Sequence, residues 1–192
     1  MTTEPYHLGI LRQALLDAAA GLLAERGPDE VSTRAVAKMV GVSHNAPYRH
    51  FASRDALLAG LAQQGFEGLI AAFHVALAGS TDPRRRMIAV SEAYVAFAVQ
   101  HPSIYLLMFS QVLNKLAFPE LQQAAGTSLK IVCDVVVELR GETDAELHAR
   151  GAWAMVHGIA TLLIEDRLMK RGSPDALLSL ALENYITGMM SK

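Results

Sequence analysis

The chain has 192 residues, of which 52% are hydrophobic and 19% are charged, and its formal net charge is −2 at pH 7. This length allows a sizeable core, and because charges interrupt every long apolar run we expect no membrane span. The single cysteine, Cys133, excludes an internal disulfide and a cysteine-based zinc site, and the amino-terminal residues lack the basic-then-apolar pattern of a secretory signal.

The first predicted helix covers residues 8–26. Apolar residues recur there at the spacing of one buried helix face, and Gly27-Pro28 is a typical stop signal. The residues of that face are Leu11, Leu15, Ala18 and Leu22. We expect this helix to pack against the next two as part of a three-helix domain.

Two short helices joined by a tight turn are predicted over residues 32–51. Ser32 is placed to cap the first helix, and Gly41 to end it, since glycine adopts the left-handed conformation without a Cβ penalty. Ser43 is placed to cap the second helix. Helix, glycine-containing turn and helix form the helix-turn-helix pattern, whose second helix enters the DNA major groove.

The charge of this region agrees with DNA binding. The segment Val31–Arg54 carries four of the chain's 17 Lys and Arg residues and none of its 19 Asp and Glu residues. A slightly acidic chain therefore concentrates positive charge here, as a phosphate-facing surface requires. The alternative is an ordinary helical hairpin with a solvated basic face. Capping, turn, charge and polar side chains together favour DNA binding.

The segment VSTRAVAKMVGVSHNAPYRHFASRDALL resembles the DNA-binding domain of the tetracycline-repressor (TetR) family of bacterial regulators. The matching features are a Ser/Thr start, an apolar helix, Gly-Val-Ser, Tyr-x-His-Phe and Ser-Arg-Asp-x-Leu-Leu. The chain departs from the family at Pro47, where many members carry a helix former. Near a helix start, proline removes at most the first intrahelical amide bond. The resemblance implies a helix-turn-helix domain over residues 8–55.

The second helix offers side chains that suit base edges and phosphates. Asn45 suits bidentate contact with adenine and Arg49 with guanine, whereas Ala46 and Pro47 offer only apolar contact. The resemblance also implies phosphate contacts, which orient a protein on DNA without specifying sequence. Those phosphate positions are Thr33, Tyr48, His50 and Arg54. The predicted interface is completed by Ser43 and by Arg34 and His44, each able to reach a base or a phosphate.

Residues 56–192 are predicted to form a second, helical domain. Asp82-Pro83 and Ser173-Pro174 are cap-plus-proline helix starts, and Thr143 or Asp144 is placed to cap a helix that reaches about Arg171. The β-branched run at residues 131–137 has a strand as its alternative, but it lies inside a capped helical pattern. We therefore predict an all-α fold of about nine helices.

Residues 152–168, AWAMVHGIATLLIEDRL, resemble the C-terminal domain of one TetR subgroup, named for its Trp-His-Gly (WHG) element. In the family such domains form the dimer, usually through the last two helices, and enclose a small-molecule pocket. The resemblance therefore implies a homodimer and an unknown small-molecule effector. Core packing is the alternative role for each candidate pocket residue. These candidates are Tyr94, Phe97, Tyr105, Met108, Phe109, Trp153 and His157.

The sequence thus predicts a cytoplasmic transcriptional repressor that binds a palindromic operator as a dimer and is released by an effector. An activator stays open, because the same groove contacts serve both. The alternatives from other classes are an architectural DNA-binding protein without an effector and a helical enzyme. No nucleophile elbow or phosphate loop supports an enzyme. The seven histidines show no paired metal-ligand spacing, so we expect no metal and no cofactor.

Overall fold

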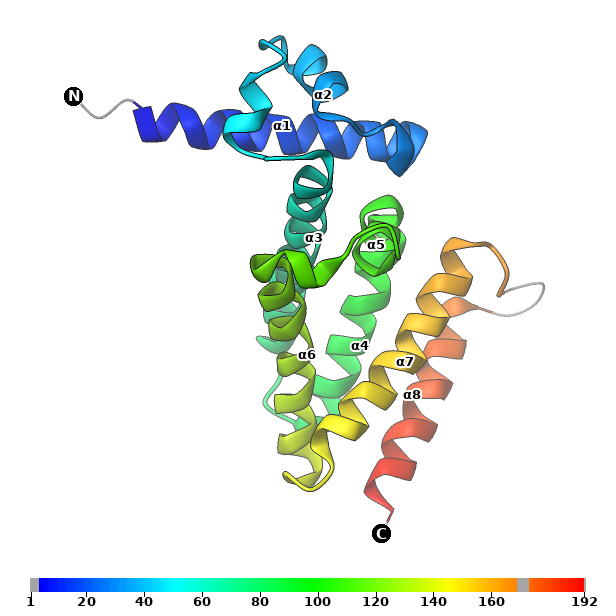
Figure 1. Ribbon diagram of the computed structural model, residues 1–192. Coiled ribbons are helices and arrows are strands. Elements are labelled where there is room, and N and C mark those ends of the chain that lie inside the picture. Colours follow the sequence, from blue (N-terminus) through cyan, green and yellow to red (C-terminus); the bar gives the residue numbers. More distant parts are fainter. Residues whose placement is uncertain (1–3, 169–172, 192) are drawn as a thin grey trace. The chain divides into compact units, whose positions relative to one another are not determined.

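The computed structural model describes residues 4–168 and 173–191, which form eight α-helices, three short 3-10 helices and no strand (Figure 1). The predicted all-α fold is confirmed. Of the about nine predicted helices, eight are α-helices and the second helix of the helix-turn-helix is a 3-10 helix. The elements are α1 (Glu4–Arg26), η1 (Pro28–Glu30), α2 (Thr33–Val40), η2 (Ala46–Arg49), α3 (Arg54–Leu77), α4 (Pro83–Gln100), α5 (Pro102–Phe109), η3 (Lys115–Ala117), α6 (Pro119–Arg140), α7 (Ala145–Ile164) and α8 (Pro174–Met190).

The chain divides into two compact units. The first comprises Met1–Gly65 and Ser103–Gln123, and the second comprises Phe66–Pro102 and Ala124–Lys192. Helix α3 contributes its first half to one unit and its second half to the other. The predicted division into folding domains at residues 8–55 and 56–192 stays a prediction.

In the first unit, α1 and α2 pack together around an apolar core. Leu15 and Leu22 of the predicted stripe are buried, whereas Leu11 and Ala18 are only half-buried. The buried face also includes Leu16, Ala19 and Leu23, so it is displaced from the predicted stripe. The guanidinium of Arg12 lies over the ring of the buried Phe51, 5.4 Å from its centroid. This core supports the helix-turn-helix from below (Figure 1).

In the second unit, α4 packs against α7 and α8, which also pack against each other. The β-branched run on α6 is helical, as predicted, and contributes Val135 and Val136 to the core. Two ion pairs join α4 to its neighbours. Arg84 pairs with Glu183 of α8 at 3.2 Å, and Arg86 pairs with Glu138 of α6 at 2.9 Å. Two of the three N-terminal arginines of α4 therefore link helices, and among the described residues Arg85 pairs only with Asp82 at the start of its own helix.

Capping follows the sequence at most helix starts. The side chains of Asp82 and Ser173 accept hydrogen bonds from backbone amides of α4 and α8, as predicted. The capping prediction for α7 is wrong, because its N-cap Asp144 has a left-handed backbone and no side-chain cap bond. Helix α7 also ends at Ile164, earlier than the predicted Arg171, which lies outside the described residues.

The expectation of no membrane span needs one correction. Helix α3 is long enough and apolar enough to cross a membrane, because its most apolar 18-residue stretch has a mean hydropathy of 1.3. Of that stretch, 56% is buried inside the protein. The apolar composition is therefore explained by burial, because the two halves of α3 contribute apolar side chains to the cores of the two units.

Candidate nucleic-acid interface

Helix α2 is built as the sequence predicts. The Ser32 hydroxyl accepts from the Ala35 amide at 3.1 Å, which satisfies one of the orphaned donors of the first turn. Val31 and Val36 are both fully buried and fix the entering chain against the core. Gly41 ends the helix with a φ of 77°, in the left-handed region that favours glycine.

The second element is shorter and tighter than predicted. It is the 3-10 helix η2, whose N-cap is Asn45 and not the predicted Ser43, and Asn45 makes no side-chain cap bond. Pro47 explains this difference. A proline has no amide hydrogen, so the α-helical bond to the Ser43 carbonyl cannot form, and the Ala46 amide donates to that carbonyl instead at 2.9 Å. The Pro47 side chain is buried, whereas its neighbour Ala46 is half-buried and its neighbour Tyr48 is exposed.

The structure sorts the eleven predicted DNA-binding residues by exposure. Thr33 and Pro47 are buried, and both have supporting positions beneath the surface. Three others are half-buried, namely Ala46, His50 and Arg54. The remaining six are exposed on α2, the turn and η2: Arg34, Ser43, His44, Asn45, Tyr48 and Arg49. These six form the candidate interface, and their contacts with DNA stay a prediction.

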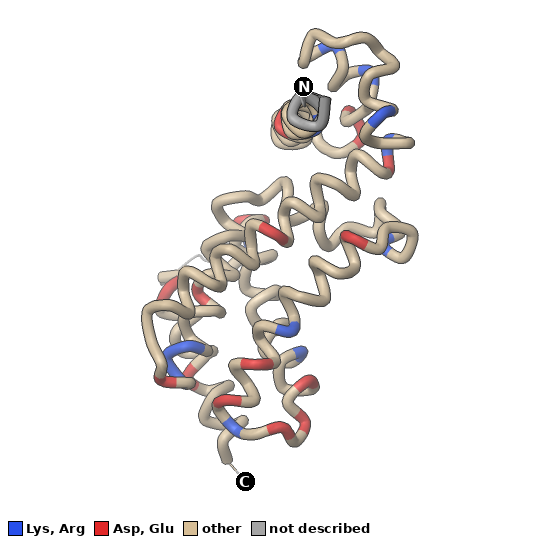
Figure 2. Tube along the Cα trace, turned by 90° about the vertical axis from the view of Figure 1, so that its left-hand side faces the viewer, with Lys and Arg blue, Asp and Glu red and all other residues tan. Residues whose placement is uncertain are grey.

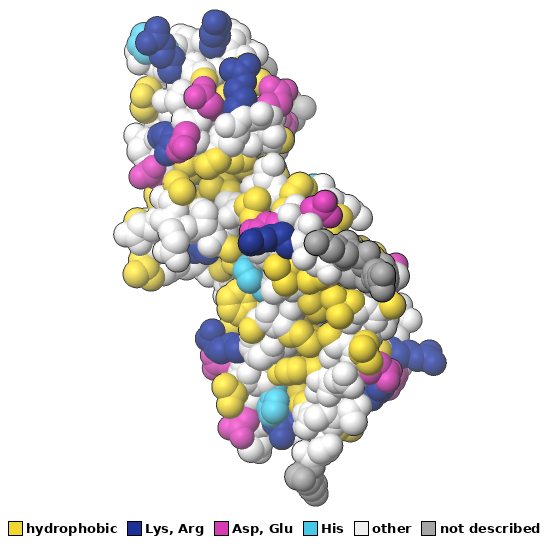
Figure 3. All heavy atoms as spheres, turned by 90° about the vertical axis from the view of Figure 1, so that its right-hand side faces the viewer, with side chains coloured by type: hydrophobic (Ala, Val, Ile, Leu, Met, Phe, Trp, Pro, Cys, Tyr) yellow, Lys and Arg dark blue, Asp and Glu magenta, His cyan; other side chains and the backbone are white. Residues whose placement is uncertain are grey.

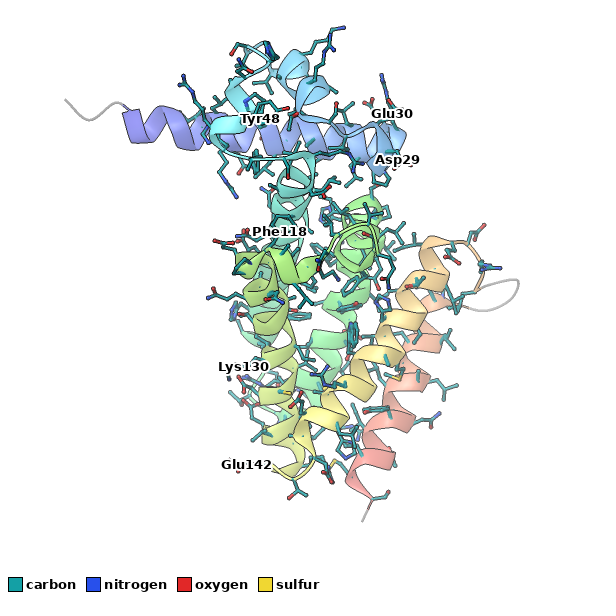
Figure 4. All side chains as sticks on the ribbon, viewed as in Figure 1. Asp29, Glu30, Tyr48, Phe118, Lys130 and Glu142 are labelled. Carbon is teal, nitrogen blue, oxygen red and sulfur yellow. The ribbon has the colours of Figure 1, made fainter. Side chains whose placement is uncertain are left out.

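Positive charge on this surface is not neutralised by the chain itself. Among the described residues, Arg34, Lys38 and Arg49 form no ion pair. Figure 2 shows Lys and Arg positions along the helix-turn-helix of the first unit. The acids nearest in sequence are Asp29 and Glu30 before α2 and Asp55 at the start of α3, and Figure 4 shows Asp29 and Glu30 at η1, well away from Tyr48. The surface can therefore attract the phosphates of a duplex.

A hollow lies between α2 and the turn. It has a volume of about 360 Å³ and is lined by Arg34, His44 and Tyr48. Tyr48 is 53% exposed, and its hydroxyl is 3.2 Å from the hydroxyl of Thr33, which is 6% exposed. A cation, an imidazole and a phenol thus border a space open to solvent, which suits an anionic group such as a phosphodiester.

Arg54 has a role that the sequence did not indicate. Its Nε donates to the Val31 carbonyl at 2.8 Å, and one Nη donates to the Pro28 carbonyl at 2.5 Å. Carboxylates of Asp29 and Asp55 lie 3.9 and 3.8 Å from the guanidinium. Arg54 therefore clamps the chain that enters α2 to the start of α3. No local pattern could reveal this role, because the acceptors are backbone carbonyls more than 20 residues away.

His50 lies in an electropositive, partly buried setting. Burial lowers its pKa below the ordinary value of 6.5, and the cations Arg12 and Arg49 lower it further. Its Nε2 is buried and has no hydrogen-bond partner among the described residues. His50 therefore favours the neutral form in the free protein, which limits what it adds to the charge of the surface.

The candidate pocket residues fall into both units. Tyr105, Met108 and Phe109 belong to the first unit, and the other four belong to the second. In the second unit the Trp153 indole donates to the Tyr94 hydroxyl at 3.2 Å, and this hydroxyl is 2.9 Å from Nδ1 of His157. Tyr94 and Phe97 are both buried. The structure thus joins three of the candidates in one polar cluster, and the effector pocket stays a prediction.

Comparison with known proteins places the chain in a family. Residues 15–61 match the description "Bacterial regulatory proteins, tetR family", and residues 87–185 match "Tetracyclin repressor-like, C-terminal domain". The second match alone covers more than half of the chain. The resemblance of residues 152–168 to the WHG subgroup stays a prediction.

Three relatives extend over most of the chain. A protein with unknown function from Rhodococcus sp. RHA1 has a solved structure with a TM-score of 0.86, 34% identity, and coverage of 94% of this chain and 96% of that one. The uncharacterized HTH-type transcriptional regulator YobS of Bacillus subtilis (strain 168) is 26% identical over 95% of this chain and 94% of its own length. The HTH-type transcriptional activator FasR of Mycolicibacterium smegmatis is 26% identical over 80% of this chain and 69% of its own length. With its helix-turn-helix, its all-helical fold and both family matches, the chain belongs to the TetR family of DNA-binding transcriptional regulators.

Proposed function

We propose that the protein is a cytoplasmic repressor that binds a palindromic operator as a homodimer and leaves it when a small molecule binds the second unit. The observation that carries this proposal is the exposed, acid-free surface of α2 and η2. Its cations Arg34, Lys38 and Arg49 form no ion pair among the described residues, and Arg34 lines a hollow that suits a phosphate. Two of the three relatives, YobS and FasR, are named transcriptional regulators, which favours regulation over catalysis.

We expect a dimer because one helix-turn-helix contacts only a short DNA sequence. Two copies related by a two-fold axis read a palindrome with useful affinity and selectivity. Figure 3 shows hydrophobic side chains gathered over the face of the second unit that α7 and α8 form. Exposed apolar side chains on these helices support an interface between two copies. They are Leu147, Leu162, Leu180 and Met190.

The effector site would lie around the Tyr94 cluster. Its hydroxyl, indole and imidazole converge in a unit whose buried residues are apolar apart from Ser91 and Ser128, and ligand sites combine a mostly apolar wall with a few placed polar groups. This arrangement favours a small, largely apolar molecule with one polar end. A thermal shift of the purified protein across a panel of such molecules tests this part of the proposal.

The direction of regulation has a second candidate. FasR, one of the relatives, is named a transcriptional activator. The groove contacts are the same in both cases, so the position of the operator relative to the promoter decides the sign. A reporter gene behind the selected operator, with and without this protein, distinguishes repression from activation.

Selection of bound sequences from random duplex DNA tests DNA recognition directly. The full-length protein should enrich a palindrome, and light scattering at micromolar concentration should give the mass of a dimer. Asn45→Ala should then relax the preference at one base pair of each half-site, at a cost of about 1–3 kcal/mol for the wild-type sequence. Equal loss on the operator and on random DNA would show that Asn45 does not read a base. A monomer that enriches no sequence would refute the proposed function.

A further inference from the structure

Thr33 and Tyr48 form a pair of hydroxyls that spans the helix-turn-helix. Thr33 opens α2, Tyr48 belongs to η2, and their oxygens lie 3.2 Å apart. Thr33 is only 6% exposed, whereas Tyr48 is 53% exposed and lines the hollow with Arg34 and His44. The buried hydroxyl is thus shielded from a DNA backbone that the outer hydroxyl can reach.

The chemistry of the two hydroxyls determines which one donates and which one accepts. A phenolic oxygen accepts one hydrogen bond while its own hydrogen donates another. Phosphate oxygens only accept, so a Tyr48 hydroxyl that donates its hydrogen to a phosphate keeps its oxygen available to accept a hydrogen bond from a donor behind it. Thr33 is that donor in the structure. A bond donated by Thr33 also polarises the phenol and strengthens the bond that it donates outward.

We propose that Thr33 is a positioning residue, which holds the Tyr48 hydroxyl as a donor to a DNA backbone phosphate in the hollow beside Arg34 and His44. The inference rests on the proposed DNA-binding function. It differs from a direct grip of Thr33 on phosphate, because the bond to the DNA is made by Tyr48. A backbone contact carries no sequence information, so the effect of Thr33 should be equal on all sequences.

The test uses the full-length protein and a labelled 30-base-pair duplex of random sequence, with fluorescence anisotropy as the readout. Thr33→Val keeps the shape of the side chain and removes the hydroxyl, and it should weaken binding by about fivefold, as the loss of one hydrogen bond predicts. Thr33→Ser keeps the hydroxyl and should bind like the wild type. In a Tyr48→Phe background, Thr33→Val should cause no further loss.

Two further measurements separate positioning from a general structural role. The ratio of affinities for a selected operator and for random DNA should stay unchanged in Thr33→Val, because the base-reading residues keep their places. A changed ratio would mean that Thr33 holds η2 as a whole, and would overturn the proposal. A full additional loss in the Tyr48→Phe background, or wild-type binding by Thr33→Val, would also overturn it.

Folding is checked by thermal melting of each variant. If Thr33→Val does not fold, Thr33→Ala replaces it, and if neither folds the hydroxyl serves the fold and the proposal is wrong. Wild-type protein that binds no duplex would refute the proposed function itself. Wild-type binding with unaffected variants would refute only the role of Thr33.

Discussion

The basic side chains of the two units differ in whether they form ion pairs. In the second unit, basic side chains on α4, α6 and α7 pair with carboxylates at 2.6–3.2 Å. On the helix-turn-helix, Arg34, Lys38 and Arg49 form no ion pair among the described residues, and the acids nearest in sequence lie at η1 and at the start of α3. Paired cations leave little field at the surface, whereas unpaired ones keep their attraction for an anionic partner.

Arg54 differs from these three cations. It lies in the acid-free segment by sequence, yet its guanidinium donates to two backbone carbonyls and has two carboxylates nearby. The charged group of Arg54 therefore interacts with backbone carbonyls and carboxylates of the first unit. Position within a basic segment does not distinguish a cation that faces DNA from one that holds the domain together.

The largest expected effect comes from Arg54→Ala. Removal of the guanidinium leaves the carbonyls of Pro28 and Val31 without their donor, so the free energy of unfolding should fall by about 2 kcal/mol. Urea unfolding should show a lower midpoint with an unchanged slope. Arg49→Ala is the matched control, because this exposed side chain lies outside the clamp and its loss should change stability by less than about 0.5 kcal/mol. Equal stability of both variants would show that the clamp is not needed.

A smaller effect is expected on DNA affinity from Arg34→Ala. Loss of a charge-assisted contact should weaken binding to duplex DNA by about tenfold at low salt, and the slope of log K against log salt should fall by about one. Lys130→Ala is the control from the second unit, where Asp134 holds the ammonium at 2.6 Å. Its affinity and salt slope should match those of the wild type. An equal loss in both variants would contradict the distinction between paired and unpaired cations.

The parts of the fold that local chemistry decides were predictable from the sequence. Ser32, Gly41, Asp82 and Ser173 mark helix ends through bonds made within a few residues, and the structure confirms each of them. The 3-10 form of η2 was not predicted, although its cause, Pro47, was visible as a departure from the family pattern. We expected a proline near a helix start to remove at most one hydrogen bond. The missing amide of Pro47 instead goes with a 3-10 pattern of hydrogen bonds in the element.

The candidate site was predictable only in outline. Residue types and charge indicated which segment forms the candidate interface. Burial and hydrogen-bond partners, which the structure supplies, separate its exposed residues from its supporting ones. Thr33 lies beneath Tyr48, and Arg54 bonds to backbone carbonyls, through contacts that span 15 to 26 residues. Arg12 acts on the site from α1, where the sequence indicated only an apolar stripe. Such long-range contacts depend on tertiary packing, which leaves no local pattern.

The smallest expected effect concerns His50 and pH. Burial, Arg12 and Arg49 lower the pKa of His50 in the native state below its ordinary value of 6.5. As pH falls through 6.5 the unfolded chain binds a proton at this position before the native chain does, so the free energy of unfolding falls. His50→Gln should therefore lose less stability than the wild type between pH 7.5 and pH 5.5 in urea unfolding. His44→Gln, at an exposed position of the same surface, should follow the wild type. Parallel curves for all three proteins would show that the cations around His50 are too well screened to affect the fold, which would also weaken the case for an unneutralised positive field at this surface.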